Sequence, residues 1–146
     1  MASVTVRTLQ PNDFPSWLPL WNDNNLGHKD EALTAETWSR LMDADFPVNG
    51  LCAIYKGEMV GILQYVLHYT TGAIAQICYM QDVFVNPDCR GKGIAKALIA
   101  ELDKIGRAEK WGRIYWLADA GNEAAQGLYK NIGVKLDFTL HIQPLN

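Results

Sequence analysis

The chain has 146 residues, of which 49% are hydrophobic and 20% charged, a balance typical of one folded domain with a sizeable core. A formal net charge of −3 argues against nucleic acid as a partner, because duplex binding requires a strongly basic surface. No segment has the pattern of a signal peptide or a membrane span, and the three cysteines lack metal-ligand spacing. We therefore expect a cytoplasmic protein that binds neither a metal nor a membrane.

Residue patterns predict a mixed α/β order of elements. Asn12 or Asp13 can cap a first helix and Thr34 a second, and Ile94 begins a stripe of apolar residues at helical spacing. The expected elements follow in chain order: a strand at 4–9, helices beginning near 12 and 34, strands at 51–55, 59–69 and 74–85, a helix at 93–108, a strand at 113–118, a helix at 122–131 and a strand at 134–142.

The segment that follows the strand at 74–85 has the features of an anion-binding turn. The strand stops at Pro87, and Gly91 and Gly93 precede the start of the next helix. Backbone N–H groups and the positive end of the helix dipole then point at one place, and small residues let a ligand approach closely. The spacing matches neither a P-loop nor a dinucleotide fingerprint. We expect a phosphate-bearing ligand here, and the alternative is an ordinary tight turn before a helix.

A second group of candidate residues lies on the expected helix at 122–131. Asn122, Ala125 and Tyr129 are three or four residues apart, so they share one helix face. Asn122 can cap the helix or bind a ligand, and the Tyr129 phenol can protonate a departing thiolate. The alternative is that Asn122 is only a cap and Tyr129 only a core residue.

Taken together, the two segments resemble the motifs of the GNAT superfamily of acetyl-CoA-dependent N-acetyltransferases. The first motif reads Arg90-Gly-Lys-Gly-Ile-Ala95, and the second consists of Asn122, Ala125, Leu128-Tyr129 and Gly133. The strand Met-Gln-Asp-Val-Phe-Val at 80–85 is similar to that of the polyamine and diamine acetyltransferases, and other segments look like the branch with the yeast histone and polyamine acetyltransferases. Gln81 stands where that branch usually has Glu.

The resemblance implies a single N-acetyltransferase domain over residues 1–146. Its fold would be α/β with α+β character, in the three layers typical of the superfamily. A mixed, mostly antiparallel central sheet of about six or seven strands would be flanked by about four helices. The resemblance also suggests a homodimer, with the C-terminal strand at the interface.

The resemblance also implies a cosubstrate, acetyl-CoA, and roles for particular residues. Backbone groups of Val83 and Val85 would pair with the pantetheine arm, the amides of residues 91–96 would hold the pyrophosphate with Arg90 at the entrance, and Tyr129 would be the general acid. Asp82 is the first candidate for the base that deprotonates the amine, and a structural hydrogen-bond acceptor is the alternative. The expected coenzyme-binding residues are Val83, Phe84, Val85, Arg90, Gly91, Lys92, Gly93, Ile94, Ala95, Lys96, Asn122, Ala125 and Tyr129.

The expected reaction is direct attack of a primary amine on acetyl-CoA in a ternary complex, without an acyl-enzyme. The acceptor would be a small amine that is polyamine-like, derived from an amino acid or aminoglycoside-like. Acetylation of a protein or peptide amine is the second enzymatic possibility. A non-catalytic acyl-CoA sensor and a purely structural domain are the alternatives from other classes.

Overall fold

The computed structural model describes residues 3–146 and divides into two compact units. Unit 1 ends at Trp116, and unit 2 spans Leu117–Asn146. The expected mixed α/β fold is confirmed, with four α-helices and a five-stranded sheet among the described residues.

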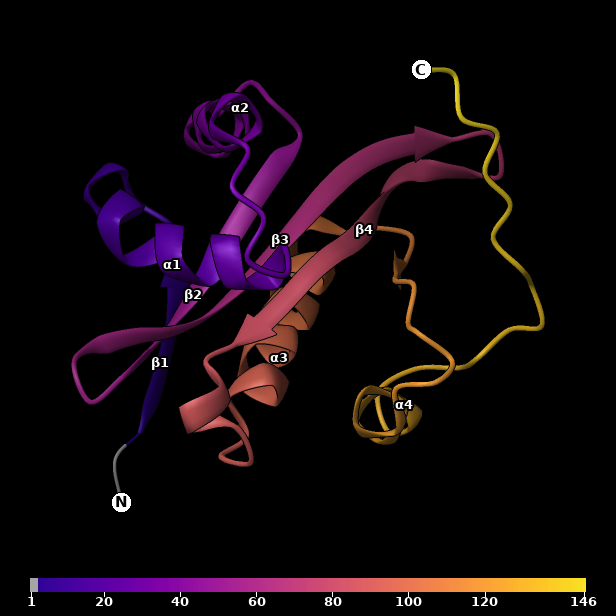
Figure 1. Ribbon diagram of the computed structural model, residues 1–146. Coiled ribbons are helices and arrows are strands. Elements are labelled where there is room, and N and C mark those ends of the chain that lie inside the picture. Colours follow the sequence, from indigo (N-terminus) through magenta and orange to yellow (C-terminus); the bar gives the residue numbers. More distant parts are fainter. Residues whose placement is uncertain (1–2) are drawn as a thin grey trace. The chain divides into compact units, whose positions relative to one another are not determined.

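Unit 1 contains one mixed sheet with helices on both of its faces. Figure 1 shows α1 and α2 on one face and α3 behind the other. The strands lie in the order β1-β2-β3-β4-β5; the first four pair antiparallel, and β5 pairs parallel to β4. The bounds are β1 (Val4–Thr8), α1 (Phe14–Asn24), α2 (Glu31–Met42), β2 (Val48–Tyr55), β3 (Glu58–Thr70), β4 (Ala73–Val85), α3 (Ile94–Glu109) and β5 (Ile114–Tyr115), with 3-10 turns at Pro11–Asp13 and Pro87–Cys89.

Unit 2 contains α4 (Glu123–Lys130) and a C-terminal stretch without helix or strand. The expected count of six or seven strands is therefore too high, and the expected strand at 134–142 is wrong. Apolar residues do alternate along that stretch, but a strand also needs a neighbour for its backbone groups, and none pairs with it in the part of the chain that the structure describes. The expected strand at 113–118 shortens to the two residues of β5.

The second helix begins earlier than its expected cap. Asp30 caps α2, because its side chain accepts a hydrogen bond from the backbone N–H of Leu33 at 3.0 Å. Thr34 lies inside α2 and is buried, and its hydroxyl accepts a hydrogen bond from the Trp21 indole at 2.8 Å. The prediction of Thr34 as the cap was wrong, since its hydroxyl joins α2 to α1 instead.

The core of unit 1 has a part on each face of the sheet. On the α1 face, the buried Trp17, Cys52 and Ile62 belong to one apolar cluster. On the α3 face, a Cβ at Gly61 of β3 would lie only 3.2 Å from side-chain atoms of both Ile94 and Leu98. The glycine therefore allows the first two turns of α3 to approach β3 closely, which sets the start of α3 beside the end of β4.

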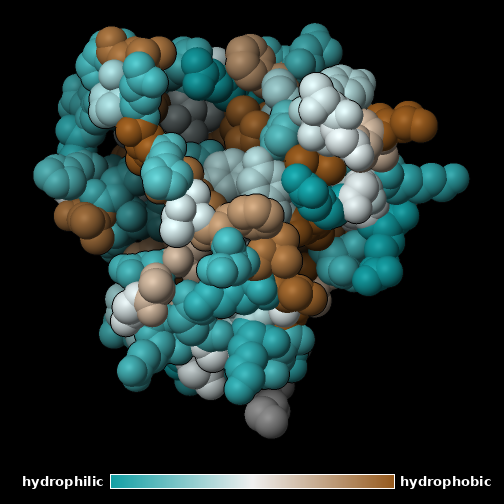
Figure 2. Space-filling model, turned by 90° about the vertical axis from the view of Figure 1, so that its right-hand side faces the viewer, coloured by the Kyte–Doolittle hydropathy of each residue, from teal (hydrophilic) through white to brown (hydrophobic). Residues whose placement is uncertain are grey.

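Some hydrophobic side chains also reach the surface. Figure 2 shows them as several separate brown areas on one face of the molecule. Among the described residues, the strongly exposed ones include Tyr69 and Ile74, which lie near the turn between β3 and β4.

Candidate active site

The expected anion-binding turn lies between β4 and α3. Gly91 and Gly93 both adopt left-handed backbone conformations, with φ of +79° and +77°. Gly93 is the N-cap of α3, and no side chain caps the first turn of that helix, whose first N–H groups have no partner within the helix. A Cβ at either glycine would meet no other atom within 4 Å. Backbone donors at a helix N-terminus therefore border open space, as a phosphate cradle requires.

Basic side chains surround this turn. Arg90 donates from Nε to the carbonyl oxygen of Val85 at 3.1 Å, and its guanidinium carbon lies 5.5 Å from the centre of the Phe84 ring. The ammonium groups of Lys92 and Lys56 lie 5.9 Å and 5.5 Å from the centre of the Tyr55 ring. These contacts hold cationic groups beside the turn, where they favour an anionic ligand.

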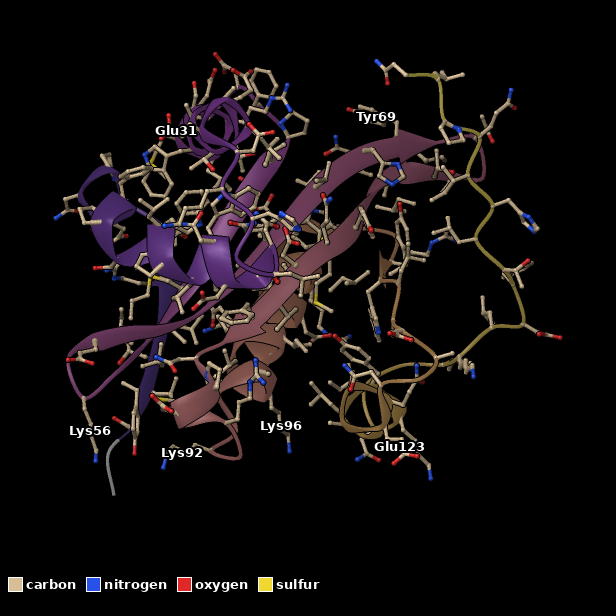
Figure 3. All side chains as sticks on the ribbon, viewed as in Figure 1. Glu31, Lys56, Tyr69, Lys92, Lys96 and Glu123 are labelled. Atoms are coloured by element: carbon tan, nitrogen blue, oxygen red, sulfur yellow. The ribbon has the colours of Figure 1, made fainter. Side chains whose placement is uncertain are left out.

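Lys56 was not among the expected site residues. It reaches this region from the turn between β2 and β3, more than thirty residues before the glycines. Figure 3 shows Lys56, Lys92 and Lys96 toward the same end of unit 1. Lys56 comes there only because β2 pairs with β3 and β3 in turn pairs with β4, and no local motif signals it.

The outer edge of β4 is open beyond Tyr79. The N–H of Asn86 donates to the carbonyl oxygen of Val60 in β3 at 2.7 Å. Along an antiparallel pair, every second residue turns its backbone groups toward the partner strand. The backbone groups of Phe84 therefore also face β3, and those of Val83 and Val85 face away from it. On that side β5 pairs only with Cys78 and Tyr79. Among the described residues no strand therefore pairs with the outward groups of Val83, although the carbonyl of Val85 already accepts from Arg90.

A β-bulge in β4 decides where the Asp82 side chain points. The register passes from Gln64 opposite Asp82 to Tyr65 opposite Met80, which leaves Gln81 as the extra residue. Asp82 thus shares a sheet face with Gln64, the face that α1 covers. The sequence left the orientation of Asp82 open because strand alternation cannot reveal a bulge.

The Asp82 carboxylate accepts two hydrogen bonds from neutral amides. Its Oδ2 accepts from Gln64 Nε2 at 2.8 Å, and its Oδ1 accepts from Asn24 Nδ2 at 3.1 Å. Gln64 Oε1 in turn accepts from the Trp17 indole N–H at 2.7 Å. Sequence reasoning missed this chain, although one glutamine within the apolar run of β3 is a signal that a buried polar group needs partners.

Two stacked phenols continue the same face beyond Asp82. The rings of Tyr79 and Tyr115 are 5.1 Å apart with an interplanar angle of 19°, and His68 Nε2 lies 2.7 Å from the Tyr115 hydroxyl oxygen. Burial raises the pKa of Tyr79, and the nearby Asp82 carboxylate raises it further. Asp82 and these aromatic side chains form one polar and aromatic surface.

Unit 2 holds the expected residues Asn122, Ala125 and Tyr129 on or next to α4. The side chain of Asn122 accepts a hydrogen bond from the backbone N–H of Ala125 at 3.0 Å, so it caps the helix. Burial raises the pKa of Tyr129 above its ordinary value. Its phenol therefore keeps its proton throughout the neutral range, as a general acid must.

Comparison with known proteins identifies the family. A model of the acetyltransferase (GNAT) family matches residues 9–134. The chain therefore belongs to the GNAT acetyltransferase family, and the mixed α/β fold described above is the fold of that family.

Individual relatives share most of their length with this chain. It is 28% identical over 146 residues to the D-amino-acid N-acetyltransferase HPA3 of Saccharomyces cerevisiae, with 94% of this chain and 89% of the yeast protein covered. It is 30% identical over 117 residues to the glucosamine 6-phosphate N-acetyltransferase of Trypanosoma brucei brucei, with 75% of this chain and 76% of that protein covered. A solved structure of the aminoglycoside N-acetyltransferase AAC(6')-Iy in complex with CoA has a TM-score of 0.85 at 19% identity, and the match covers 100% of this chain and 97% of that one.

The described residues contain neither a candidate membrane span nor a cluster of metal ligands. Within residues 3–146 no helix is both long and apolar enough to cross a membrane. In the same range, no three side chains of His, Cys, Asp or Glu gather in a way that could hold a metal ion.

Proposed function

We propose that this protein transfers the acetyl group of acetyl-CoA to the primary amine of a small molecule, by direct attack in a ternary complex. The observation that carries the proposal is the turn at Gly91 and Gly93, where backbone donors at the start of α3 border open space in a member of an acetyltransferase family. The family match includes parts of both units, which supports one acetyltransferase domain over residues 1–146.

The residues of unit 1 fit the coenzyme in two respects. The amides from Gly91 to Lys96 and the nearby Arg90 suit the pyrophosphate, since charge-assisted hydrogen bonds to anions are the stronger kind. The outward backbone groups of Val83 suit an extended amide-containing arm, which would add to the open edge of β4 as a further strand does. When bound, acetyl-CoA supplies the acetyl group as an activated thioester.

Asp82 is the residue of unit 1 that we assign to the amine. An amine with a pKa near 10 is almost wholly charged at neutral pH, so it must be bound as a cation and lose a proton before it attacks. The partners described for Asp82 are neutral amides, and its carboxylate keeps lone pairs for an ammonium group or a water relay. Gln81, the bulge residue, is exposed and lacks the carboxylate usual in the polyamine branch.

Tyr129 is the residue that we assign to the leaving group. A phenol whose pKa is raised by burial stays protonated, and it can then donate to a thiolate at the moment of transfer. Asn122 and Ala125 remain proposed contacts of the coenzyme on the same helix.

A thiol-release assay with acetyl-CoA and a panel of amines tests the proposal, with products identified by mass spectrometry. The acceptors after which the relatives are named suggest the first classes to try: D-amino acids, amino sugars and aminoglycosides. We expect acetylation of at least one of these classes. Turnover on peptides alone would support a protein or peptide acetyltransferase instead. Coenzyme binding without any turnover would support a sensor, and absence of both would contradict the proposal.

We also propose that the protein is a homodimer whose interface includes the C-terminal stretch. This stretch carries exposed apolar side chains at alternate positions: Val134, Leu136, Phe138, Leu140 and Ile142. Such a pattern suits a segment that packs one apolar face against another chain. Analytical ultracentrifugation should give twice the mass of the chain, and Phe138→Ser should shift the protein toward the monomer. A wild-type protein that stays monomeric at high concentration would show that this proposal is wrong.

A further inference from the structure

The hydrogen-bonded chain from Trp17 through Gln64 to Asp82 has only one chemically consistent direction. The indole N–H of Trp17 is a donor and never an acceptor, so the group that faces it at 2.7 Å must be Gln64 Oε1. The other half of the Gln64 amide, its NH₂ group, then faces Asp82 Oδ2 at 2.8 Å. The orientation of the glutamine is therefore set by its neighbours and not by solvent.

Burial makes this orientation difficult to lose. Gln64 is only 4% exposed, and rotating its amide would place two donors against each other at Trp17 and two acceptors against each other at Asp82. Each mismatch in a buried site costs about the desolvation of an unpaired polar group. Gln64 thus links the indole of the core residue Trp17 to the Asp82 carboxylate by two hydrogen bonds, one at each end of its amide.

Asn24 donates to the other oxygen of the same carboxylate. It is the last residue of α1, and its side-chain NH₂ group donates to Asp82 Oδ1 at 3.1 Å. The carboxylate is held at both oxygens, one from β3 and one from α1, so it can neither rotate nor withdraw without breaking a bond. An ionised carboxylate offers about four lone-pair positions, and this arrangement uses one on each oxygen.

We propose that Gln64 is a positioning residue that, together with Asn24, holds the Asp82 carboxylate in the orientation that receives the acceptor amine. This inference rests on the proposed function, because it deepens the role assigned to Asp82. Gln64 itself acts through Asp82 and is not assigned any contact with the substrate. A group held within a fraction of an ångström of its working geometry matters because a misplacement of about 1 Å can cost ~100-fold in rate.

The test compares variants that break this chain with one that breaks a similar bond elsewhere. Gln64→Leu removes the donor to Asp82 Oδ2, and Asn24→Ala removes the donor to Oδ1 at a half-buried helix end, where we expect the smaller loss of stability. Thr34→Val is the matched control, because it breaks a buried hydrogen bond of 2.8 Å from another α1 tryptophan, Trp21, without touching Asp82. Thermal unfolding of each variant measures the purely structural cost.

Steady-state kinetics with the best amine of the panel then separate positioning from stability. We expect kcat/KM for the amine to fall about tenfold in Gln64→Leu and in Asn24→Ala, while KM for acetyl-CoA stays within about twofold of wild type. Thr34→Val should leave both parameters unchanged at a comparable loss of melting temperature. If Gln64→Leu does not fold, Asn24→Ala decides the question alone.

Two outcomes overturn the inference, and they can be told apart. If the wild-type protein is active and the Gln64 and Asn24 variants match the Thr34→Val control, Gln64 is only structural and the proposed function stands. If the wild-type protein acetylates no amine, the proposed function fails and the inference fails with it.

Discussion

Replacing Gly93 with alanine tests the proposed coenzyme-binding role of the turn, because it changes the backbone freedom and the open space at one position. Gly93 has φ of +77°, and a Cβ there would meet no other atom of the protein within 4 Å. The new methyl group therefore causes no clash in the free protein but occupies the space where we expect the pyrophosphate. Gly27 is a matched control, with φ of +79° and equally open surroundings in the loop between α1 and α2.

The two effects of this substitution have different sizes. A non-glycine residue in the left-handed conformation costs roughly 1–2 kcal/mol, so both variants should lose a similar amount of stability and about 3 °C or more in melting temperature. Only Gly93→Ala should also lose a charge-assisted hydrogen bond to the ligand, worth about 1.5–3 kcal/mol. That loss corresponds to a Kd for acetyl-CoA that is about 10-fold to 100-fold weaker.

Isothermal titration with acetyl-CoA measures the affinity, and thermal shift provides a second measurement. At a ligand concentration about 100 times the wild-type Kd, binding stabilises the protein by ~2.7 kcal/mol, and a tenfold weaker Kd reduces this to ~1.4 kcal/mol. The ligand-induced rise in melting temperature should therefore fall by about half in Gly93→Ala and stay unchanged in Gly27→Ala. A Gly93→Ala protein that binds acetyl-CoA within twofold of wild type would refute the reasoning that places the pyrophosphate at this turn.

Three further predictions concern single side chains. Tyr129→Phe should lower kcat by about 10²-fold or more with little change in KM for acetyl-CoA, since only the acid is lost; an unchanged kcat across pH would show that Tyr129 is not the acid. Burial raises the pKa of Tyr65 to about 12, so the unfolded chain loses this proton near pH 10, before the folded protein does. The free energy of unfolding should therefore fall as the pH rises from about 10 to about 12. Tyr65→Phe should reduce that fall, which urea titrations at alkaline pH can measure. The Arg7 guanidinium donates from Nη1 and Nη2 to the Asp13 carboxylate at 2.7 Å and 2.9 Å and lowers the pKa of that carboxyl. The stability from this pair is therefore present above about pH 4 and is lost as the pH falls through the lowered pKa. Asp13→Asn should cost roughly 1–3 kcal/mol at neutral pH and should make the free energy of unfolding depend less on acid pH.

The residues that sequence could place are those whose chemistry is local. The turn at Gly91 and Gly93 is readable because left-handed backbone and a helix start both depend on neighbouring residues, and the structure has both. The cap at Asn122 follows from the same kind of short-range hydrogen bond. The prediction of four helices held for this reason, since helix signals repeat within one turn.

The errors fell where a second segment decides the outcome. Residues 134–142 alternate as a strand does, yet a strand exists only when another strand accepts its hydrogen bonds. Thr34 has the residue type of a helix cap, but its hydroxyl accepts a hydrogen bond from Trp21 of the neighbouring helix. Lys56 shares the Tyr55 ring with Lys92 only because β2 and β4 both pair with β3.

The sequence by itself indicated the family, the glycine turn before α3, and Asp82 and Tyr129 as candidate residues. Tertiary structure alone decided what surrounds Asp82, because a one-residue bulge at Gln81 sets the face on which the carboxylate lies. It also brought Gln64 and Asn24, which are 18 and 58 residues away in the chain, to the two carboxylate oxygens. A bulge and long-range hydrogen bonds both depend on how distant strands and helices pack, so neither could be read from a short stretch of this sequence.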